Sequence, residues 1–380
     1  MSPNRAPDNG RFYELDILRG VAALVVVAYH YVHFYYTDQF QPDLYVDVPF
    51  FDLLRPIYQH GLWFVDLFFS ISGYVFFWLY SEPIRSGAVS IKSFAVARIA
   101  RLYPLHLVTL GVTVGLMLLF QALFGYDFVY QGNTLLNFVL NLFLIHQWVP
   151  GAVQSFNGPT WSISVELWMY GVFFMFCLWK GGRLALGGMT LIGIIIHLIS
   201  PDSMVGRALP CFFLGGVAYA CVQALTAKGM EVQIRGPGLG LALSGWVISY
   251  LFGHEGITGP VTGWVSAVFS KDVFVLVLVP LTLIVLGLWR GEMATKHLKP
   301  FVWLGDISYS TYLIHFPLQL LIMIGLNGLT PATKAAVIAS PAFFMAFFAV
   351  LIGVSIISYG QFEMKARLWL LRRFSPRYRH

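Results

Sequence analysis

Long apolar stretches follow one another along this chain, separated by short loops, and they limit what it can fold into. Hydrophobic residues make up 58% of its 380 residues and charged residues only 11%, and the mean hydropathy is +0.71. In an average soluble domain about a quarter of the residues are charged. The sequence therefore predicts an all-α fold, a polytopic membrane helix bundle rather than a soluble domain.

Ten of these stretches are close to the roughly 20 residues that a helix needs to cross a bilayer. They cover residues 17–36, 60–80, 102–124, 161–179, 184–200, 207–223, 237–253, 272–289, 302–325 and 335–360. The segment 134–149 is apolar but short, so we expect it to be re-entrant or interfacial on the outer side. Since no internal repeat or appended soluble domain is visible, we predict one membrane domain over residues 1–364 and a basic cytosolic tail over 365–380.

The Lys and Arg residues predict how the bundle is oriented. With the N-terminus in the cytosol, 19 of the 24 fall on the cytosolic side. The other five are Arg55, Arg207, Lys271 and Lys334 on the outer side and Arg19 within a span. Because cytosolic loops of membrane proteins carry such an excess, we expect both termini in the cytosol. The formal charge of +6 then reflects orientation and does not indicate nucleic-acid binding.

The N-terminus and the cysteines indicate neither processing nor metal binding. The first ten residues are polar and no small-residue cleavage site follows the first apolar run, so that run is expected to stay as a signal anchor. Cys177, Cys211 and Cys221 lie in apolar runs without the spacing of metal ligands. We therefore expect no disulfide framework and no metal site.

Two polar residues, Arg19 and His30, interrupt the first apolar stretch. They are eleven positions apart, close to three helical turns, so they share a face and lie roughly 16 Å apart along the axis. Each would cost about 2.5 kcal/mol or more if it faced lipid. We therefore interpret the pair as one wall of a polar conduit, with a binding end and a chemical end.

Four ionisable residues from four predicted spans lie at a similar depth in the outer half of the membrane: His30, Asp66, Glu166 and His315. Ionisable residues inside a membrane need partners and mark functional sites. A carboxylate beside a histidine orients the ring and raises its basicity, as a general base requires. The alternative is a polar cluster that only joins helices, and His315 alone could simply bond a backbone carbonyl.

Arg98 and Arg101 precede the third predicted span and lie three residues apart, on one helix face. Two guanidinium groups at a cytosolic mouth would suit a phosphate clamp. Ordinary positive-inside bias with contact to anionic lipid explains the pair equally well. Pro104 suits the first turn of the helix that follows.

Residues 158–166 are expected to form a turn that leads into the fourth span. Thr160 or Ser162 could cap that helix, and Trp161 suits a belt at the membrane interface. Glu166 has no comparable structural explanation, which is why it stays among the predicted functional residues.

Several motifs, in order over nearly the whole chain, together resemble the acyltransferase 3 family of bacterial membrane O-acyltransferases. They are the Arg-x10-His pattern of Arg19 and His30, DLFFSISGY from Asp66 to Tyr74, RIARLYP from Arg98 to Pro104, WSISVE from Trp161 to Glu166, and SYSTYLIHFP from Ser308 to Pro317. A degenerate C-terminal match ends at Glu363, to which no role is given. The hydrolase-like domain fused to some members is not found, so a stand-alone form is expected.

The resemblance implies acyl transfer from cytosolic acyl-CoA to a hydroxyl of an extracytoplasmic glycan. His30 would deprotonate that hydroxyl or carry the acyl group transiently, and Asp66 or Glu166 would orient it. Arg98 and Arg101 would hold the coenzyme A phosphates, with Arg19 beside the pantetheine arm or the thioester. Supporting roles would fall to residues of the matched motifs, namely Trp161, Ser164, Tyr309 and His315.

The resemblance also implies a bacterial inner-membrane enzyme that uses no metal and acts on a polysaccharide or lipid-linked glycan. Acetyl-CoA is the expected donor, with a succinyl donor as its rival. A different class, a proton-coupled secondary transporter of an anionic solute, would use the same arginines and histidine–carboxylate layer. Transporter folds usually show an internal repeat, which this chain lacks. A subunit that only scaffolds glycan assembly is a third possibility.

Overall fold

The computed structural model describes residues 11–36, 47–149, 151, 153–201, 203–252, 270–289 and 297–374. Within these ranges every regular element is helical. The α-helices are α1 (Tyr13–Tyr29), α2 (Phe51–His60), α3 (Trp63–Arg85), α4 (Ile91–Phe124), α5 (Leu135–Leu142), α6 (Trp161–Leu178), α7 (Arg183–Ile199), α8 (Met204–Ala227), α9 (Glu231–Phe252), α11 (Lys271–Val273), α12 (Val279–Leu288), α14 (Trp303–Leu326), α15 (Pro331–Ile338), α16 (Pro341–Ser358) and α17 (Met364–Phe374). The 3-10 helices are η2 (His30–Tyr35), η3 (Gly158–Thr160) and η5 (Lys299–Phe301), and the π-helices are η4 (Phe274–Leu278) and η6 (Tyr359–Glu363).

The predicted all-α membrane bundle is confirmed. Within the described residues, eight helical segments are long and apolar enough to cross a membrane. Helices α7, with 17 residues, and α9, with 22, occupy the two remaining predicted ranges. The number of spans and the side on which each terminus lies stay predictions.

The predicted boundaries are wrong at two places where proline is involved. Helix α4 begins at Ile91 rather than at residue 102, since the Ser90 side chain caps it by accepting a hydrogen bond from the backbone N–H of Ser93. Pro104 therefore lies inside this helix and not in its first turn. The predicted span 335–360 is divided into α15 and α16, because Pro341 begins a new helix capped by Ser340.

Two other predicted segments have a defined structure. Residues 134–149 contain the eight-residue helix α5, about 12 Å long, which is too short to span a bilayer. The described part of the predicted tail forms α17, which packs against α4. The end of that tail, residues 375–380, falls outside the described residues.

Glycines bring two pairs of helices into backbone contact. A Cβ atom at Gly20 of α1 would lie 2.5 Å from the carbonyl carbon of Leu304, and one at Gly305 of α14 would lie 2.3 Å from the carbonyl oxygen of Asp16. Gly73 of α3 meets α8 in the same way, with 1.9 Å to the carbonyl oxygen of Phe212. Such contacts are how membrane helices pack closely.

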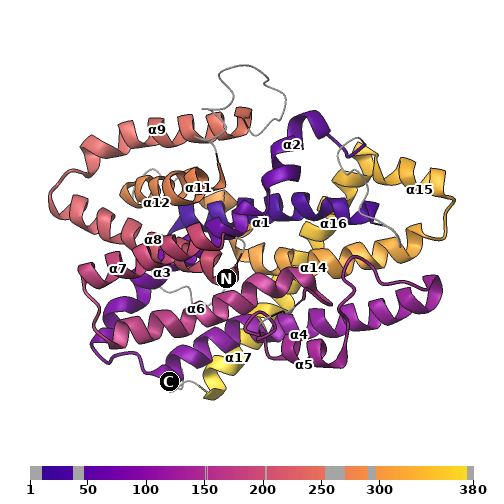
Figure 1. Cartoon of the computed structure of the whole chain (residues 1–380), viewed down its shortest axis with the longest axis horizontal. Coiled ribbons are helices and arrows are strands. Elements are labelled where there is room, and N and C mark those ends of the chain that lie inside the picture. Colours follow the sequence, from indigo (N-terminus) through magenta and orange to yellow (C-terminus); the bar gives the residue numbers. More distant parts are fainter. Residues whose placement is uncertain are drawn as a thin grey trace.

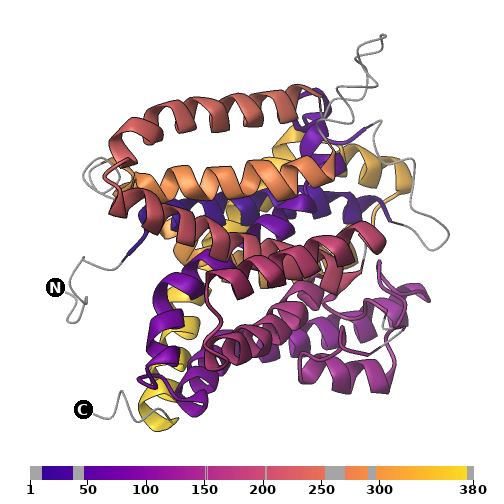
Figure 2. The ribbon, with the colours of Figure 1, turned by 60° about the vertical axis from the view of Figure 1, so that its left-hand side comes forward.

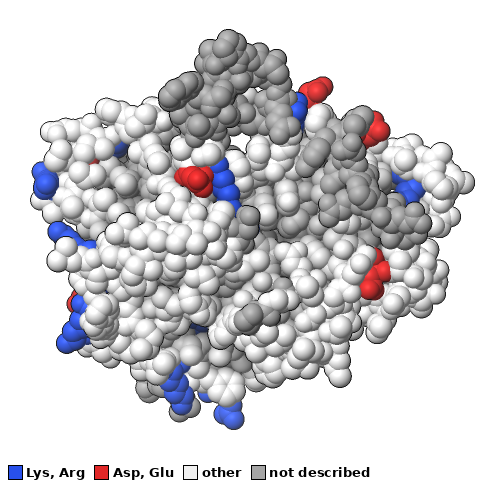
Figure 3. All heavy atoms as spheres, viewed as in Figure 1, with Lys and Arg blue, Asp and Glu red and all other residues white. Residues whose placement is uncertain are grey.

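The contacts place α1 and α14 at the centre of the bundle. Helices α9 and α12 lie on one side of this pair, and α4, α5 and α6 lie on the other (Figures 1 and 2). The broad face in Figure 3 carries few charged side chains, while Lys and Arg gather along its left and lower margins. An uncharged band of this kind suits a surface in contact with lipid.

Candidate active site

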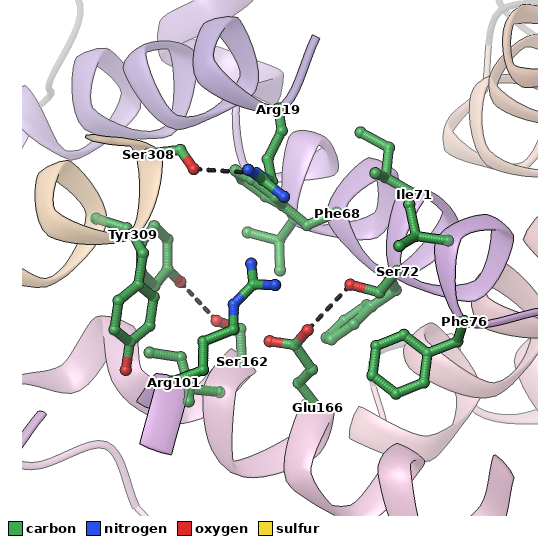
Figure 4. Close-up of a pocket in the computed structure, with 15 residues that line it drawn as sticks. Arg19, Phe68, Ile71, Ser72, Phe76, Arg101, Ser162, Glu166, Ser308 and Tyr309 are labelled. Carbon is green, nitrogen blue, oxygen red and sulfur yellow. Dashed lines mark hydrogen bonds between the residues drawn. The ribbon is translucent and has the colours of Figure 1, made fainter. Parts of the chain in front are cut away.

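A pocket of about 80 Å³ lies at the centre of the bundle, between α1, α3, α4, α6 and α14. Its charged residues are Arg19, Arg101 and Glu166 (Figure 4). Its other polar lining residues are Ser72, Ser162, Ser308, Tyr309 and Tyr312. The rest of the wall is apolar, so the few polar groups determine what the pocket can bind.

Arg101 points into this pocket toward Glu166 (Figure 4). The Glu166 carboxylate accepts hydrogen bonds from the Ser72 hydroxyl, at 2.9 Å, and from the Tyr170 hydroxyl, at 2.7 Å. Among the described residues, the Arg101 guanidinium has neither a hydrogen bond nor an ion pair. An unpaired guanidinium in a partly buried pocket favours an anionic ligand.

Arg19 enters the same pocket from α1, and α14 holds it in place. Its guanidinium donates to the Ser308 hydroxyl, to the Gly305 carbonyl and to the Asp16 carboxylate, at 3.1, 2.9 and 3.1 Å. These bonds use Nε and Nη2, so Nη1 keeps no partner within the described part of the chain. The predicted conduit wall is thus polar at its Arg19 end.

His30 begins the 3-10 helix η2 and pairs with His315 of α14, not with a carboxylate. Its Nδ1 lies 3.0 Å from Nε2 of His315, and the two rings are nearly parallel. Nδ1 of His315 lies 2.6 Å from the Tyr312 carbonyl oxygen. Because a carbonyl oxygen can only accept a hydrogen bond, this nitrogen carries the hydrogen. In the neutral pair, Nε2 of His315 then accepts from Nδ1–H of His30.

This hydrogen-bond order leaves Nε2 of His30 unprotonated. Among the described residues this nitrogen has no hydrogen-bond partner. Gln319 fixes the backbone at the same place, since its amide NH2 donates to the His30 carbonyl at 2.8 Å. Its Oε1 then accepts from Nδ1–H of His33, at 3.1 Å. His30 is thus held in the tautomer and orientation of a base or nucleophile.

The prediction that Asp66 or Glu166 orients His30 is wrong. Asp66 is 1% exposed and makes a two-pronged ion pair with Arg207 of α8, with both distances 3.0 Å. The sequence predicts Arg207 on the outer side, at the first residue of the span 207–223. A buried carboxylate takes a full cation in preference to an imidazole because the cation neutralises its charge, while Glu166 faces Arg101 in the pocket.

Arg98 and Arg101, the predicted phosphate clamp, do not share one site. Arg98 does not line the central pocket. Its guanidinium is stacked among the rings of Phe76, Tyr80, Phe94 and Tyr170, at 4.9 to 5.7 Å, and donates to the Tyr80 hydroxyl at 2.6 Å. Side chains three residues apart on a helix point in directions that differ by about 60° around the helix axis. This difference is enough to place Arg98 and Arg101 in different surroundings.

The predicted supporting residues have different surroundings. Tyr309 lines the pocket and donates to the Leu102 carbonyl. Ser164 accepts a hydrogen bond from the backbone N–H of Gln147, so it fastens the segment after α5. Trp161 is 3% exposed beneath the Arg207 guanidinium and is not part of an exposed belt. Neither Thr160 nor Ser162 caps α6; their hydroxyls bond Asn157 and Tyr312 instead.

Three residues beside the site were not among the predicted site residues. Gln319 follows His315 by four residues, and His33 follows His30 by three, so both could have been found from helical spacing. Glu363 was given no role, yet its buried carboxylate accepts from the Ser310 hydroxyl at 2.8 Å. It lies in the π-helix η6, a distortion that is frequent near functional sites.

The pocket and the histidine pair meet at Tyr312. Its side chain lines the pocket, and its carbonyl accepts the hydrogen bond from Nδ1–H of His315. His30 is not among the residues that line the pocket, so the continuous passage expected from Arg19 to His30 stays a prediction. One element, α14, carries Ser308, Tyr309, Tyr312 and His315 and connects both parts of the site.

Two known proteins are similar to parts of this chain. An acyltransferase named MdmB, from Streptomyces mycarofaciens, is 31% identical over 166 residues, which are 43% of this chain and 38% of that protein. A protein described as protein 2 in the picA locus of Rhizobium radiobacter is 35% identical over 102 residues, 27% of this chain and 44% of that protein. The matches thus span less than half of either relative. No solved structure matches the chain.

The sequence profile described as an acyltransferase domain matches residues 12–360, nearly the whole chain. That range includes Arg19, His30, Arg101, Glu166 and His315, the residues that form the pocket and the histidine pair. The chain is therefore a multi-pass membrane protein of the acyltransferase 3 family.

Proposed function

We propose that this protein transfers an acetyl group from acetyl-CoA to a hydroxyl of an extracytoplasmic polysaccharide or lipid-linked glycan, in the bacterial inner membrane. The observation that carries the proposal is the hydrogen-bond order from His30 through His315 to the Tyr312 carbonyl. It leaves Nε2 of His30 as an unprotonated nitrogen at one end of the site. Two arginines able to bind an anion lie toward the other end.

His30 acts as general base in this proposal. Nε2 takes the proton of the acceptor hydroxyl, and the oxygen forms a bond to the thioester carbonyl carbon. The tetrahedral intermediate then collapses as the carbon–sulfur bond breaks, and the His30 imidazolium returns its proton to the leaving thiolate. In the covalent alternative, Nε2 attacks the thioester carbon, the carbon–sulfur bond breaks and the thiolate leaves. The acceptor hydroxyl then attacks the acyl carbon, the bond from that carbon to Nε2 breaks, and the hydroxyl proton passes to the thiolate.

Acetyl-CoA is a substrate in this scheme, and no metal takes part. Arg101 lines the pocket and attracts the anionic end of the donor, because its guanidinium makes no ion pair with any residue that the structure describes. Arg19 lies further along, where Nη1 remains free to bond the pantetheine arm or the thioester oxygen. To reach His30, the donor then passes Tyr312. This passage requires the Tyr312 ring to rotate.

The experiment measures free thiol released from acetyl-CoA by the purified protein in nanodiscs. General base catalysis is worth about 10²–10⁴-fold, so the variant His30→Ala is expected to lose at least a hundredfold in kcat. The variant His106→Ala is the matched control, since His106 is also a buried histidine of the bundle but bonds the Asn141 carbonyl and does not line the pocket. An unchanged rate in His30→Ala would refute the assignment.

Mass spectrometry of surface glycans tests the acceptor. Cells producing the wild-type protein should carry glycans heavier by one acetyl group than cells producing the His30→Ala protein. A mass difference of a succinyl group would correct the donor, and identical glycans would exclude a glycan acceptor.

A further inference from the structure

Three tyrosine rings border the histidines beyond the end of α1. The Tyr29 ring lies 5.2 Å from the ring of His30. The rings of Tyr36 and Tyr130 lie 5.6 and 5.8 Å from the ring of His33, which stacks on His30 at 4.9 Å. We call Tyr29, Tyr36 and Tyr130 the tyrosine cluster. It lies directly beside the imidazole to which the proposed function assigns the chemistry.

The tyrosine cluster lies where an acceptor would arrive. All three residues are partly exposed, so a ligand can reach their rings. Tyr29 and Tyr36 are at the end of the first predicted span, and Tyr130 is in the loop between α4 and α5. By the predicted orientation these places are on the outer side, whereas the pocket arginines lie nearer the cytosol. The cluster is therefore separate from the proposed donor site.

The Tyr130 hydroxyl is the polar group that the cluster offers to a ligand. It makes no hydrogen bond with any residue that the structure describes, and it stays accessible at the surface of the cluster. Its electrostatic neighbours are the uncharged side chains of Tyr36, Tyr312 and Tyr29. A phenol hydroxyl can both donate and accept a hydrogen bond, so it can bond another hydroxyl in either direction.

Two backbone features hold the Tyr130 ring in place. A Cβ atom at Gly158 would lie 2.2 Å from Cζ of Tyr130, so a glycine is required for the ring to lie against η3. Val129, the residue before Tyr130, has a φ of 60°, in the left-handed region that β-branched residues rarely adopt. Backbone strain of this kind is concentrated at active sites and ligand-binding sites. The position of Tyr130 thus indicates a role in binding as well as in packing.

Two asparagines tie the loop of Tyr130 to α14. The Asn133 side chain donates to the Tyr130 carbonyl at 2.6 Å and accepts from the backbone N–H of Phe156 at 2.7 Å. Asn157, the next residue, donates to the Leu313 carbonyl of α14 at 3.0 Å. Tyr130 is therefore held at a fixed place relative to the histidine pair.

The composition of the tyrosine cluster indicates the class of ligand. Its polar groups are phenol hydroxyls, and the Tyr130 ring also packs 5.0 Å from the ring of Phe316. None of these side chains is a cation, so the cluster does not attract a phosphate or a carboxylate. Aromatic walls with a few hydrogen-bonding groups suit a ligand that has hydroxyls and apolar ring faces. A neutral sugar has both.

We propose that the tyrosine cluster binds a neutral sugar residue of the acceptor, with the Tyr130 hydroxyl bonded to one hydroxyl of that sugar. The rings of Tyr29 and Tyr36 pack on its C–H face, and another of its hydroxyls is then presented to His30. Tyr130 is a binding residue in this assignment and takes no proton in the reaction. The assignment rests on the proposed function, since it takes the acceptor to be a glycan.

Saturation-transfer NMR of the full-length protein in nanodiscs tests this proposal apart from the reaction, because acetyl-CoA is left out. The probes are oligosaccharides released by mild acid from the surface glycans of cells producing the His30→Ala protein, separated into a neutral and an acidic fraction. The wild-type protein is expected to bind the neutral fraction more tightly. No binding of the neutral fraction, or tighter binding of the acidic one, would overturn the proposal.

The variant Tyr130→Phe removes the hydroxyl and keeps the ring, so the protein should fold normally. We expect its Kd for the neutral oligosaccharides to rise about fivefold, the effect of one neutral hydrogen bond, with KM for acetyl-CoA unchanged. Tyr126→Phe is the matched control, because Tyr126 lies in the same loop but its hydroxyl accepts from Asn327 at 3.2 Å. Its Kd should equal that of the wild-type protein. An unchanged Kd in Tyr130→Phe would remove Tyr130 from the acceptor site.

The subsite and the reaction fail separately in these experiments. If thiol release persisted in His30→Ala while Tyr130→Phe still weakened sugar binding, the reaction would be wrong and the subsite would remain. If thiol release depended on His30 but Tyr130→Phe bound the sugar normally, only the subsite would be wrong.

Discussion

At the scale of single residues, His315 is expected to act on catalysis only by positioning His30. The variant His315→Ala removes the acceptor for Nδ1–H of His30, so that the ring loses its fixed tautomer. A hydrogen bond of about 1.4–2.8 kcal/mol corresponds to a 10- to 100-fold loss, which should appear in kcat, with KM for acetyl-CoA unchanged. Steady-state kinetics of the purified variant check this.

His315→Gln is the informative control for that experiment. The glutamine carbonyl can accept from His30 in place of Nε2, so activity should return in part. Equal losses in the alanine and glutamine variants would instead mean that His315 itself exchanges a proton with the substrate.

Arg101 provides the second prediction at this scale. Since its guanidinium lacks a partner among the described residues, Arg101→Gln should remove binding energy for an anionic donor without disturbing the fold. We expect KM for acetyl-CoA to rise about tenfold, which is the loss of one charge-assisted hydrogen bond. Arg101→Lys keeps the charge but not the bidentate guanidinium, so its KM should lie between those of the wild-type protein and Arg101→Gln. An unchanged KM in both variants would exclude Arg101 from the donor site.

The sequence was sufficient to find most of these residues, because ionisable side chains in apolar helices are rare and costly. It was not sufficient to pair them. His30 and His315 are 285 residues apart, and Asp66 and Arg207 are 141 apart. Which helices are neighbours depends on packing between their surfaces, and helical periodicity describes each surface only by itself.

At the scale of elements, the ion pair between Asp66 and Arg207 joins α3 to α8. Removing one partner of a buried pair leaves an uncompensated charge and costs about 3–5 kcal/mol. We therefore expect Asp66→Ala to lower the thermal unfolding midpoint of the purified protein. A stable but inactive Asp66→Ala protein would instead return Asp66 to the catalytic residues.

The double variant Asp66→Leu with Arg207→Met separates the two roles of this pair. Replacing both charges by apolar groups of similar size is often neutral or stabilising, so the double variant should recover the midpoint that the single variant loses. Recovery of acyl transfer together with the midpoint would establish that the pair is structural.

The length of an apolar run predicts the first and last residues of a helix only where the run and the helix begin and end together. Helix α4 begins eleven residues before its predicted start because Ser90 caps it, while Lys92, Arg98 and Arg101 interrupt the apolar run in its first turns. The split at Ser340 and Pro341 follows from a proline at a helix start, a signal present in the sequence but hidden within a continuous apolar run.

At the scale of the whole molecule, the uneven distribution of Lys and Arg predicts which side of the bundle faces the cytosol. In a background where the three cysteines are replaced by alanine, single cysteines at Lys92 and Lys228 should react with a membrane-impermeant maleimide only after the cells are permeabilised. Cysteines at Gln131 and Ala332 should react in intact cells. The opposite pattern would place the histidine pair near the cytosol and reverse the direction of acyl transfer.

The contact of Gly20 and Gly305 with the opposite helix has a consequence for how substrates arrive. With backbone against backbone at that depth, no hydrocarbon tail can slip sideways between α1 and α14 from the leaflet in which the two helices begin. In the reaction proposed above, an acceptor carried on a lipid therefore reaches His30 along this pair of helices only from the other leaflet, opposite to the side from which the proposed donor enters.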